Sequence, residues 1–382
     1  MSGAKRKKKK KKNHGFWIVM LILWVLTLAV AACTILIPGA GDWFIDNVTP
    51  LMVASYSRLT GLAGFSVGEI MIIIAAVLIV MTVLGSIVLI FLFRREGFRK
   101  FMKGLYKTDV CIITVVCLIM SVNCVALYQG STMDSNPDVE TRQYTTTELY
   151  TLRNYIVSKC NEYSQYVTRG EDGYAIYYGD LQETAKNAMH NLAERYPRLA
   201  GYYPDVKPMM FSLLMCQADM EGYYFPFSME ANVNSMMYVV NMPEAYCHEL
   251  SHLHGYILED EANFLSFLAC TGSEDPFFIY SGYMKVLNYV VNAFAPYTYT
   301  LTEEQKAEMV YSNELVNYDN IFLTPDVQAE VESRKIISSE TVSEVSSTFT
   351  DTTLKMNGVS DGMASYGRVV ALLLAYYDGI LY

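Results

Sequence analysis

The five residues 248–252 read HELSH, in which His248 and His252 flank Glu249. On a helix, two histidines four residues apart project from one face, one turn apart, so their imidazole nitrogens can share one metal ion. The glutamate between them can then reach a metal-bound water as a general base. We therefore expect a zinc-dependent hydrolase, with His248 and His252 as ligands and Glu249 as the base.

A third ligand has to come from the residues that follow His252. An HExxHxxGxxH motif would place a histidine at position 258, which is Leu258, so that class is excluded. Gly255 predicts the end of the helix, after which the chain can turn back into a second helix. Glu259 and Glu261 both lie at the expected start of that second helix, and spacing alone does not choose between them.

The elements around the motif predict how it is held. Pro243 and Glu244 suit the first turn of the helix that carries HELSH. The run Met236–Met242 is rich in strand-forming residues and predicts a strand beside the cleft, where an extended peptide could pair with it. Helical periodicity predicts helices over 146–167 and 180–195. We expect a mainly helical α+β fold with a small sheet, as in zincins.

Three uncharged, apolar segments precede this region, at 16–37, 70–93 and 110–129. Each is long enough to cross a bilayer as a helix. Eight basic residues lie between Lys5 and Lys12, and six more lie between the second and third segments. Because basic residues favour the cytoplasmic side, we expect a cytoplasmic tail over 1–15, a membrane region over 16–130 and an extracytoplasmic domain over 131–382.

The charge of the chain divides between these regions. Residues 131–382 hold 34 acidic and 14 basic residues, whereas residues 1–130 hold 5 and 15. The acidic C-terminal region argues against nucleic acid as a partner. The basic tail can be read as a solvated or nucleic-acid-binding segment, but its position before an apolar segment favours anionic lipids. The expected partners are the lipid bilayer and a peptide or protein substrate.

The cysteines leave two questions open. Cys33 ends a Val-Ala-Ala-Cys run that resembles a lipoprotein processing site, although the apolar residues after it favour an uncleaved span. The other cysteines outside the spans allow two disulfides, but the position of one of them directly before the motif favours buried free thiols. These four residues are Cys160, Cys216, Cys247 and Cys270.

Three stretches, 206–234, 243–269 and 361–377, together resemble the bacterial domain-of-unknown-function 3810 family. The Glu-Ala-Asn run that begins at Glu261 is also similar to the glutamate-bearing helix of gluzincin metallopeptidases. The resemblance implies a membrane-anchored zinc metallopeptidase with an exported HExxH domain. It favours Glu261 as the third zinc ligand, with Glu259 as the alternative.

Several further residues are candidates for supporting roles. Tyr366 and Arg368 could donate hydrogen bonds to the oxyanion that forms during peptide hydrolysis, or could be a core aromatic residue and a surface charge. His254 is expected at a solvated helix end rather than behind a ligand, and His190 is expected to be a structural or surface histidine. Glu230, Asn232 and Asn234 could shape the cleft or cap a turn.

Two functions remain open at this stage. The first is hydrolysis of peptide bonds outside the cytoplasmic membrane by zinc-activated water, with Glu249 as the general base. The alternative is a catalytically silent zinc-binding membrane sensor or binding protein. A sensor does not need a general base, so the presence of Glu249 favours the enzyme.

Overall fold

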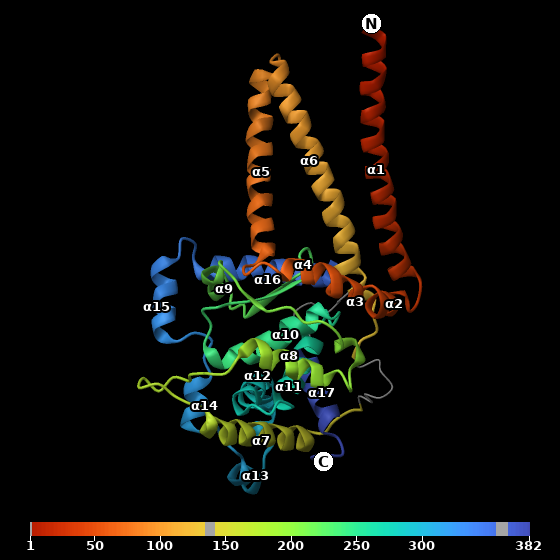
Figure 1. The fold of residues 1–382 in the computed structure, drawn as a ribbon. Coiled ribbons are helices and arrows are strands. Elements are labelled where there is room, and N and C mark those ends of the chain that lie inside the picture. The colour runs from red at the N-terminus through yellow and green to blue at the C-terminus, as the bar shows by residue number, and fades with distance from the viewer. Residues whose placement is uncertain (1, 134–141, 357–365) are drawn as a thin grey trace.

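Three long apolar helices near the N-terminus extend from one side of the molecule (Figure 1). The structure is a computed structural model that describes residues 2–133, 142–356 and 366–382. The helices are α1 (Ser2–Leu36), α5 (Val67–Leu92) and α6 (Glu96–Met120). The segments long and apolar enough to cross a membrane are His14–Leu36, Val67–Leu92 and Glu96–Gln129. The prediction of three such helices is confirmed.

The third of these segments is longer than predicted. Its helix begins at Glu96, so it includes part of the basic loop that precedes the apolar stretch. After α6 the chain stays helical through η2 (Ser121–Val125) and η3 (Leu127–Gln129). The third span therefore stays helical as far as Gln129. The part of the chain from residue 142 to residue 382 is called the C-terminal region below.

Four short helical segments connect the first two spans. They lie between the long helices and the C-terminal region, as Figure 1 shows for those it labels. Their bounds are α2 (Ala40–Asn47), α3 (Thr49–Met52), η1 (Val53–Ser57) and α4 (Arg58–Gly61). Ser66 then caps α5 by accepting a hydrogen bond from the Glu69 N–H at 3.2 Å.

The C-terminal region is mainly helical. Its helices are α7 (Thr146–Tyr163), η5 (Ser164–Tyr166), α8 (Leu181–Leu192), η6 (Pro197–Leu199), α9 (Ser212–Gln217), η7 (Val239–Asn241), α10 (Met242–Leu253), α11 (Glu259–Thr271), α12 (Pro276–Phe294), η8 (Ala295–Thr300), α13 (Glu303–Glu308), α14 (Glu314–Asp319), α15 (Pro325–Arg334), α16 (Ser339–Met356) and α17 (Tyr366–Tyr377). The helices predicted over 146–167 and 180–195 are confirmed as α7, followed by η5, and α8. A capping box of Thr145 and Glu148 begins α7.

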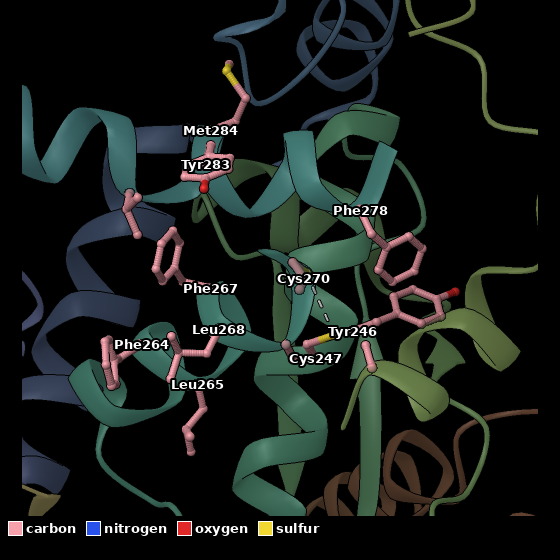
Figure 2. Packing of buried hydrophobic residues seen from close by; sticks show 14 of the residues in the cluster. Tyr246, Cys247, Phe264, Leu265, Phe267, Leu268, Cys270, Phe278, Tyr283 and Met284 are labelled. Atoms are coloured by element: carbon pink, nitrogen blue, oxygen red, sulfur yellow. Dashed lines mark hydrogen bonds between the residues drawn. The ribbon is translucent and has the colours of Figure 1, made fainter. Parts of the chain in front are cut away.

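The core forms where α10, α11 and α12 pack on one another and α7 covers α12. Figure 2 shows the aromatic residues that fill this space, among them Phe267 of α11 and Phe278 of α12, both without exposed surface. The Sγ atoms of Cys247 and Cys270 lie 3.8 Å apart in the same core. Cys160, Cys216, Cys247 and Cys270 are all buried free thiols, as expected.

A small sheet lies beside α10. It has the order β1-β3-β2, from β1 (Lys207–Pro208), β2 (Gly222–Phe225) and β3 (Glu230–Val233). β1 runs parallel to β3, and β2 runs antiparallel to it, with Tyr223 opposite Asn232. β2 is therefore an edge strand. The expectation of a mainly helical chain with a small sheet is confirmed.

The prediction of a strand over 236–242 is wrong. These residues form turns and the short helix η7 directly before α10. Tyr238 explains the difference, because its N–H donates to Phe322 O at 2.8 Å and its hydroxyl donates to Asp319 at 2.7 Å. Neither contact belongs to a sheet, so buried tertiary contacts rather than strand pairing hold the run.

Candidate metal centre

The HELSH motif lies on α10, which ends as its sequence predicts. Pro243 lies in the first turn, where its missing N–H costs nothing. His254 is the C-cap, and Gly255 has a φ of +94°, a left-handed conformation that suits glycine. The chain reverses there, and α11 begins at Glu259, which brings its first turn against the motif.

His248, His252 and Glu259 form a cluster in which one potential ligand atom from each residue lies within 4.8 Å of the others. The Nε2 atom of His248 lies 3.2 Å from one carboxylate oxygen of Glu259, and the Nε2 atom of His252 lies 3.6 Å from the other oxygen. Both histidines are buried, at 9% and 5% exposure. The structure thus brings together both predicted histidines and the alternative third ligand.

Glu261 does not join this cluster. Its carboxylate accepts a hydrogen bond from the Met133 N–H at 2.5 Å. Successive residues of an α-helix are about 100° apart around its axis, so Glu259 and Glu261 point in roughly opposite directions. Only one of the two can face the histidines, and in α11 that residue is Glu259.

Hydrogen bonds and charge orient the two rings. The Nδ1 atom of His252 lies 2.7 Å from Tyr256 O and can donate to it, which leaves Nε2 as the basic nitrogen that faces Glu259. Burial lowers the pKa of His252, but the nearby Glu259 carboxylate outweighs this effect and raises it to about 9. Burial lowers the pKa of His248. The histidines in turn hold the pKa of Glu259 well below its usual range against the effect of burial.

Glu249 lies between the two histidines in sequence and against strand β2 in space. A Cβ atom added at Gly222 would lie 2.4 Å from its Oε1 atom. The side chain is 4% exposed, and its other oxygen, Oε2, is buried without a hydrogen-bond partner. Burial raises the pKa of Glu249 to about 8. A buried carboxyl group with high proton affinity beside a cluster of potential metal ligands is suited to accept and return a proton.

A buried ion network behind His248 was not predicted. Glu244 lies one turn before His248 on α10, and its Oε1 atom is 4.0 Å from the Nδ1 atom of His248. The same oxygen accepts from Ser266 at 2.7 Å, while Oε2 lies 3.0 Å from the ammonium of Lys285. Lys285 also binds Glu221 at 2.5 Å. The spacing of four between Glu244 and His248 is the signal in the sequence that could have identified this contact.

Other predicted candidates are Arg368, Tyr366, His254 and His190. Arg368 pairs with Asp260 of α11, with 2.9 Å between Nε and Oδ2. Tyr366 begins α17, but its side chain lies outside the described part of the structure. The expectation of a solvated end at His254 is wrong, because this residue is 4% exposed and its Nδ1 atom lies 3.0 Å from Arg198 O. His190 is exposed and packs edge-on against Tyr203.

The polar residues of β3 and the residues after it have structural contacts. Asn232 donates from its side chain to Tyr223 O at 3.1 Å, and Asn234 donates to Met220 O at 3.1 Å. Both contacts support the β2–β3 hairpin. Glu230 points instead to the start of α5, where it accepts from the Gly68 N–H at 2.8 Å.

The fold and the site define a mainly helical protein with three membrane-length helices and a cluster of two buried histidines and a partly exposed glutamate. A family model described as "Protein of unknown function (DUF3810)" matches residues 44–374. The match covers most of the chain, which therefore belongs to this family, as its sequence suggested. No curated protein and no solved structure matches the chain.

Proposed function

We propose that this protein is a membrane-anchored zinc metallopeptidase that hydrolyses peptide bonds outside the cytoplasmic membrane. The observation that carries the proposal is the convergence of His248, His252 and Glu259 within 4.8 Å, next to the buried carboxyl group of Glu249. Two imidazoles and one carboxylate are the ligand set of many catalytic zinc sites, which keep a further position open. Glu259 therefore replaces Glu261 as the proposed third ligand.

The residues around the cluster fit a zinc ion. His252 has its Nδ1 atom facing a backbone carbonyl, so Nε2 is free for a metal. His248 has the Glu244 carboxylate near its Nδ1 atom. A bound zinc ion would lower the pKa of a water molecule and polarise the carbonyl group of the substrate. The nearby charge of Glu259 stabilises a proton on the His252 ring. A bound zinc ion would take the place of that proton.

Glu249 supplies the proton transfers in this proposal. Its carboxylate accepts a proton from the attacking water, and the resulting carboxylic acid returns the proton to the leaving amine. Burial favours the protonated form of this group, because it raises the pKa to about 8. The same burial therefore favours the protonated form that serves as the proton donor in the second step.

Strand β2 is the proposed binding element for the substrate backbone. One side of β2 pairs with β3, and no strand pairs with its other side among the described residues. An edge strand offers backbone N–H and C=O groups to an extended peptide. Because Gly222 of β2 lies against Glu249, a peptide paired with this strand would pass next to the general base.

The test combines metal analysis with a peptide-library cleavage assay on the full-length protein in detergent micelles. The wild type should bind about one zinc per chain and cleave peptides, and His248→Ala should lose both properties. Glu249→Gln should keep zinc while its turnover falls about 10² to 10⁴-fold. If Glu249→Gln turned over substrate like the wild type, or if the wild type bound zinc without any cleavage, a zinc-binding sensor would replace the peptidase.

A further inference from the structure

The edge strand β2 is fixed to the ends of the membrane spans through the turn that follows it. Three successive carbonyl groups of this turn accept hydrogen bonds from residues of the span ends and their connecting helices. Asn123 of η2 donates to Pro226 O at 3.0 Å, Tyr56 of η1 donates to Phe227 O at 2.5 Å, and Thr60 of α4 donates to Ser228 O at 2.8 Å. Residues at the ends of the spans therefore hold the strand next to Glu249 in place.

Two buried carboxylates hold the same regions together. Glu230 of β3 accepts from the backbone N–H groups of Val67 and Gly68 at the start of α5, at 3.2 and 2.8 Å. Glu69 of α5 accepts in return from the N–H groups of Met210 and Phe211, both at 2.8 Å. Each glutamate is 1% exposed. Separating the two regions would remove these backbone donors from two buried carboxylates, of which Glu230 would keep its ion pair with Lys207. Buried carboxylates are costly to leave with fewer hydrogen bonds, so the site has a fixed position relative to the spans.

The third span ends beside the strand that packs on Glu249. Asn123 of η2 binds the turn that follows β2, and the helical segment continues through Tyr128 to Gln129. Tyrosine is favoured where a span meets the membrane interface. Because Gly222 of β2 lies against Glu249, the proposed general base lies near the level at which the third span leaves the bilayer.

Exposed apolar side chains lie next to the ends of the spans. Leu62 and Phe65, between α4 and α5, are 84% and 52% exposed. Met210 and Leu214, at α9, are 56% and 46% exposed, and the backbone of Met210 binds Glu69 at the start of the second span. Large exposed apolar residues next to span ends are suited to contact lipid. In Figure 1, α10 and α9 lie on the span side of the C-terminal region, whereas α7 and α13 lie at its far end.

From these contacts we infer that the substrate is a membrane-anchored polypeptide that is cleaved in the segment directly next to its anchor. This inference rests on the proposed peptidase function and adds the substrate class. A peptide that pairs with β2 lies at the membrane surface because the spans hold this strand there. A peptide bond far above the bilayer would not reach Glu249, because the hydrogen bonds between the span ends and the β2–β3 hairpin fix the position of the site.

The test uses full-length protein, loaded with zinc, in vesicles of phosphatidylethanolamine and phosphatidylglycerol. Each reporter carries one apolar helix of about 20 residues as its anchor, followed by a randomised segment of about 10 residues. In the near reporter this segment directly follows the anchor. In the lifted reporter a proline-rich spacer of about 20 residues, which spans about 60 Å, separates the two. A third set contains the same random peptides without an anchor, and mass spectrometry measures cleavage.

The near reporter should be cleaved at least about tenfold faster than the lifted reporter and the free peptides, because only it holds the segment at the site. Glu249→Gln should abolish this cleavage. Equal rates for the near and lifted reporters, or faster cleavage of the free peptides, would overturn the membrane-surface inference while leaving the peptidase intact. Absence of cleavage in all three sets by the zinc-loaded wild type would overturn the proposed function, and the inference with it.

Discussion

The choice between Glu259 and Glu261 decides how the metal centre is built. In the structure, Glu259 faces both histidines and Glu261 binds the backbone of Met133. We therefore expect Glu259→Ala to lose most of its zinc, while Glu261→Ala keeps about one zinc per chain. Metal analysis of the two purified variants measures this difference, and the two substitutions are matched in chemistry. Loss of zinc in Glu261→Ala alone would show that the first turn of α11 is rotated relative to this structure.

Glu244 is a second residue expected to influence zinc binding, because its Oε1 atom lies 4.0 Å from the Nδ1 atom of His248. A carboxylate that accepts a hydrogen bond from a histidine ligand orients the ring and raises its basicity, and its loss weakens metal binding about 10 to 100-fold. The Nδ1 atom of His248 has no hydrogen-bond partner in the described part of the structure, so a small shift of the Glu244 side chain would give it this role. We expect Glu244→Gln to lower zinc affinity within this range, as measured by competition with a chelator. Glu303→Gln is the control, since Glu303 is an exposed residue of α13. Equal zinc affinities in the two variants would contradict a positioning role for Glu244.

The sequence predicts His248, Glu249 and His252 through spacing alone, because a helix fixes which residues share a face. The third ligand depends on the angle at which α11 leaves the turn at Gly255. Local spacing contains no information about that angle, so the sequence alone leaves both Glu259 and Glu261 open as the third ligand. The network of Glu221 and Lys285 could not be predicted either, since its members come from a loop and a helix far apart in the chain.

At the scale of elements, the approach of β2 to α10 makes Gly222 a sensitive position. An added Cβ atom there would lie 2.4 Å from the Glu249 carboxylate, so the base or the strand has to move. We expect Gly222→Ala to keep its zinc and to lose at least about tenfold in peptide cleavage, because a displaced base transfers protons poorly. Gly367→Ala on α17 is the control, since nothing lies within 4 Å of its added Cβ atom. Wild-type cleavage by Gly222→Ala would contradict the close packing of β2 on Glu249.

Asp319 of α14 connects three other parts of the C-terminal region through hydrogen bonds. It has no exposed surface, and it accepts hydrogen bonds from Arg169, Tyr238 and Tyr280 at 2.7–2.9 Å. Asp319→Ala leaves the Arg169 guanidinium and two hydroxyl groups without this partner. We expect the free energy of unfolding to fall by about 3–5 kcal/mol, the usual effect of breaking a buried ion pair. Denaturant titration of the solubilised protein measures it, with Asp326→Ala on the exposed surface of α15 as the control.

The contacts of Asp319 also explain why residues 236–242 do not form the predicted strand. The run Met236–Met242 has strand-forming residues, but Tyr238 directs it toward Asp319 and the residues near it. The actual strands β2 and β3 have only four residues each, and β3 is buried at every position. Such short strands lack the alternation of buried and exposed residues by which a strand is predicted. The long helices were predictable because their periodicity extends over many turns.

At the scale of the whole molecule, the three spans follow from composition, because hydropathy over about 20 residues is sufficient to identify them. The attachment of the spans to the β2–β3 hairpin does not follow from composition. It depends on single polar contacts such as those of Asn123 and Glu230, which join residues more than 100 positions apart. A sequence pattern therefore predicts a membrane anchor, while the structure shows that the span ends bind the hairpin that packs beside Glu249.

The orientation of the spans gives the last prediction. Basic residues before the first span and between the second and third favour the cytoplasmic side, which places the C-terminal region outside. In a Cys33→Ala background, a membrane-impermeant maleimide should label Tyr178→Cys in spheroplasts but not Gly97→Cys. Tyr178 is 80% exposed in the C-terminal region, and Gly97 lies in the first turn of α6, among the basic residues that precede its apolar part, with open space around an added side chain. Permeabilised cells should label both positions. If Gly97→Cys alone reacted in intact spheroplasts, the metal centre would face the cytoplasm and could not act on exported polypeptides.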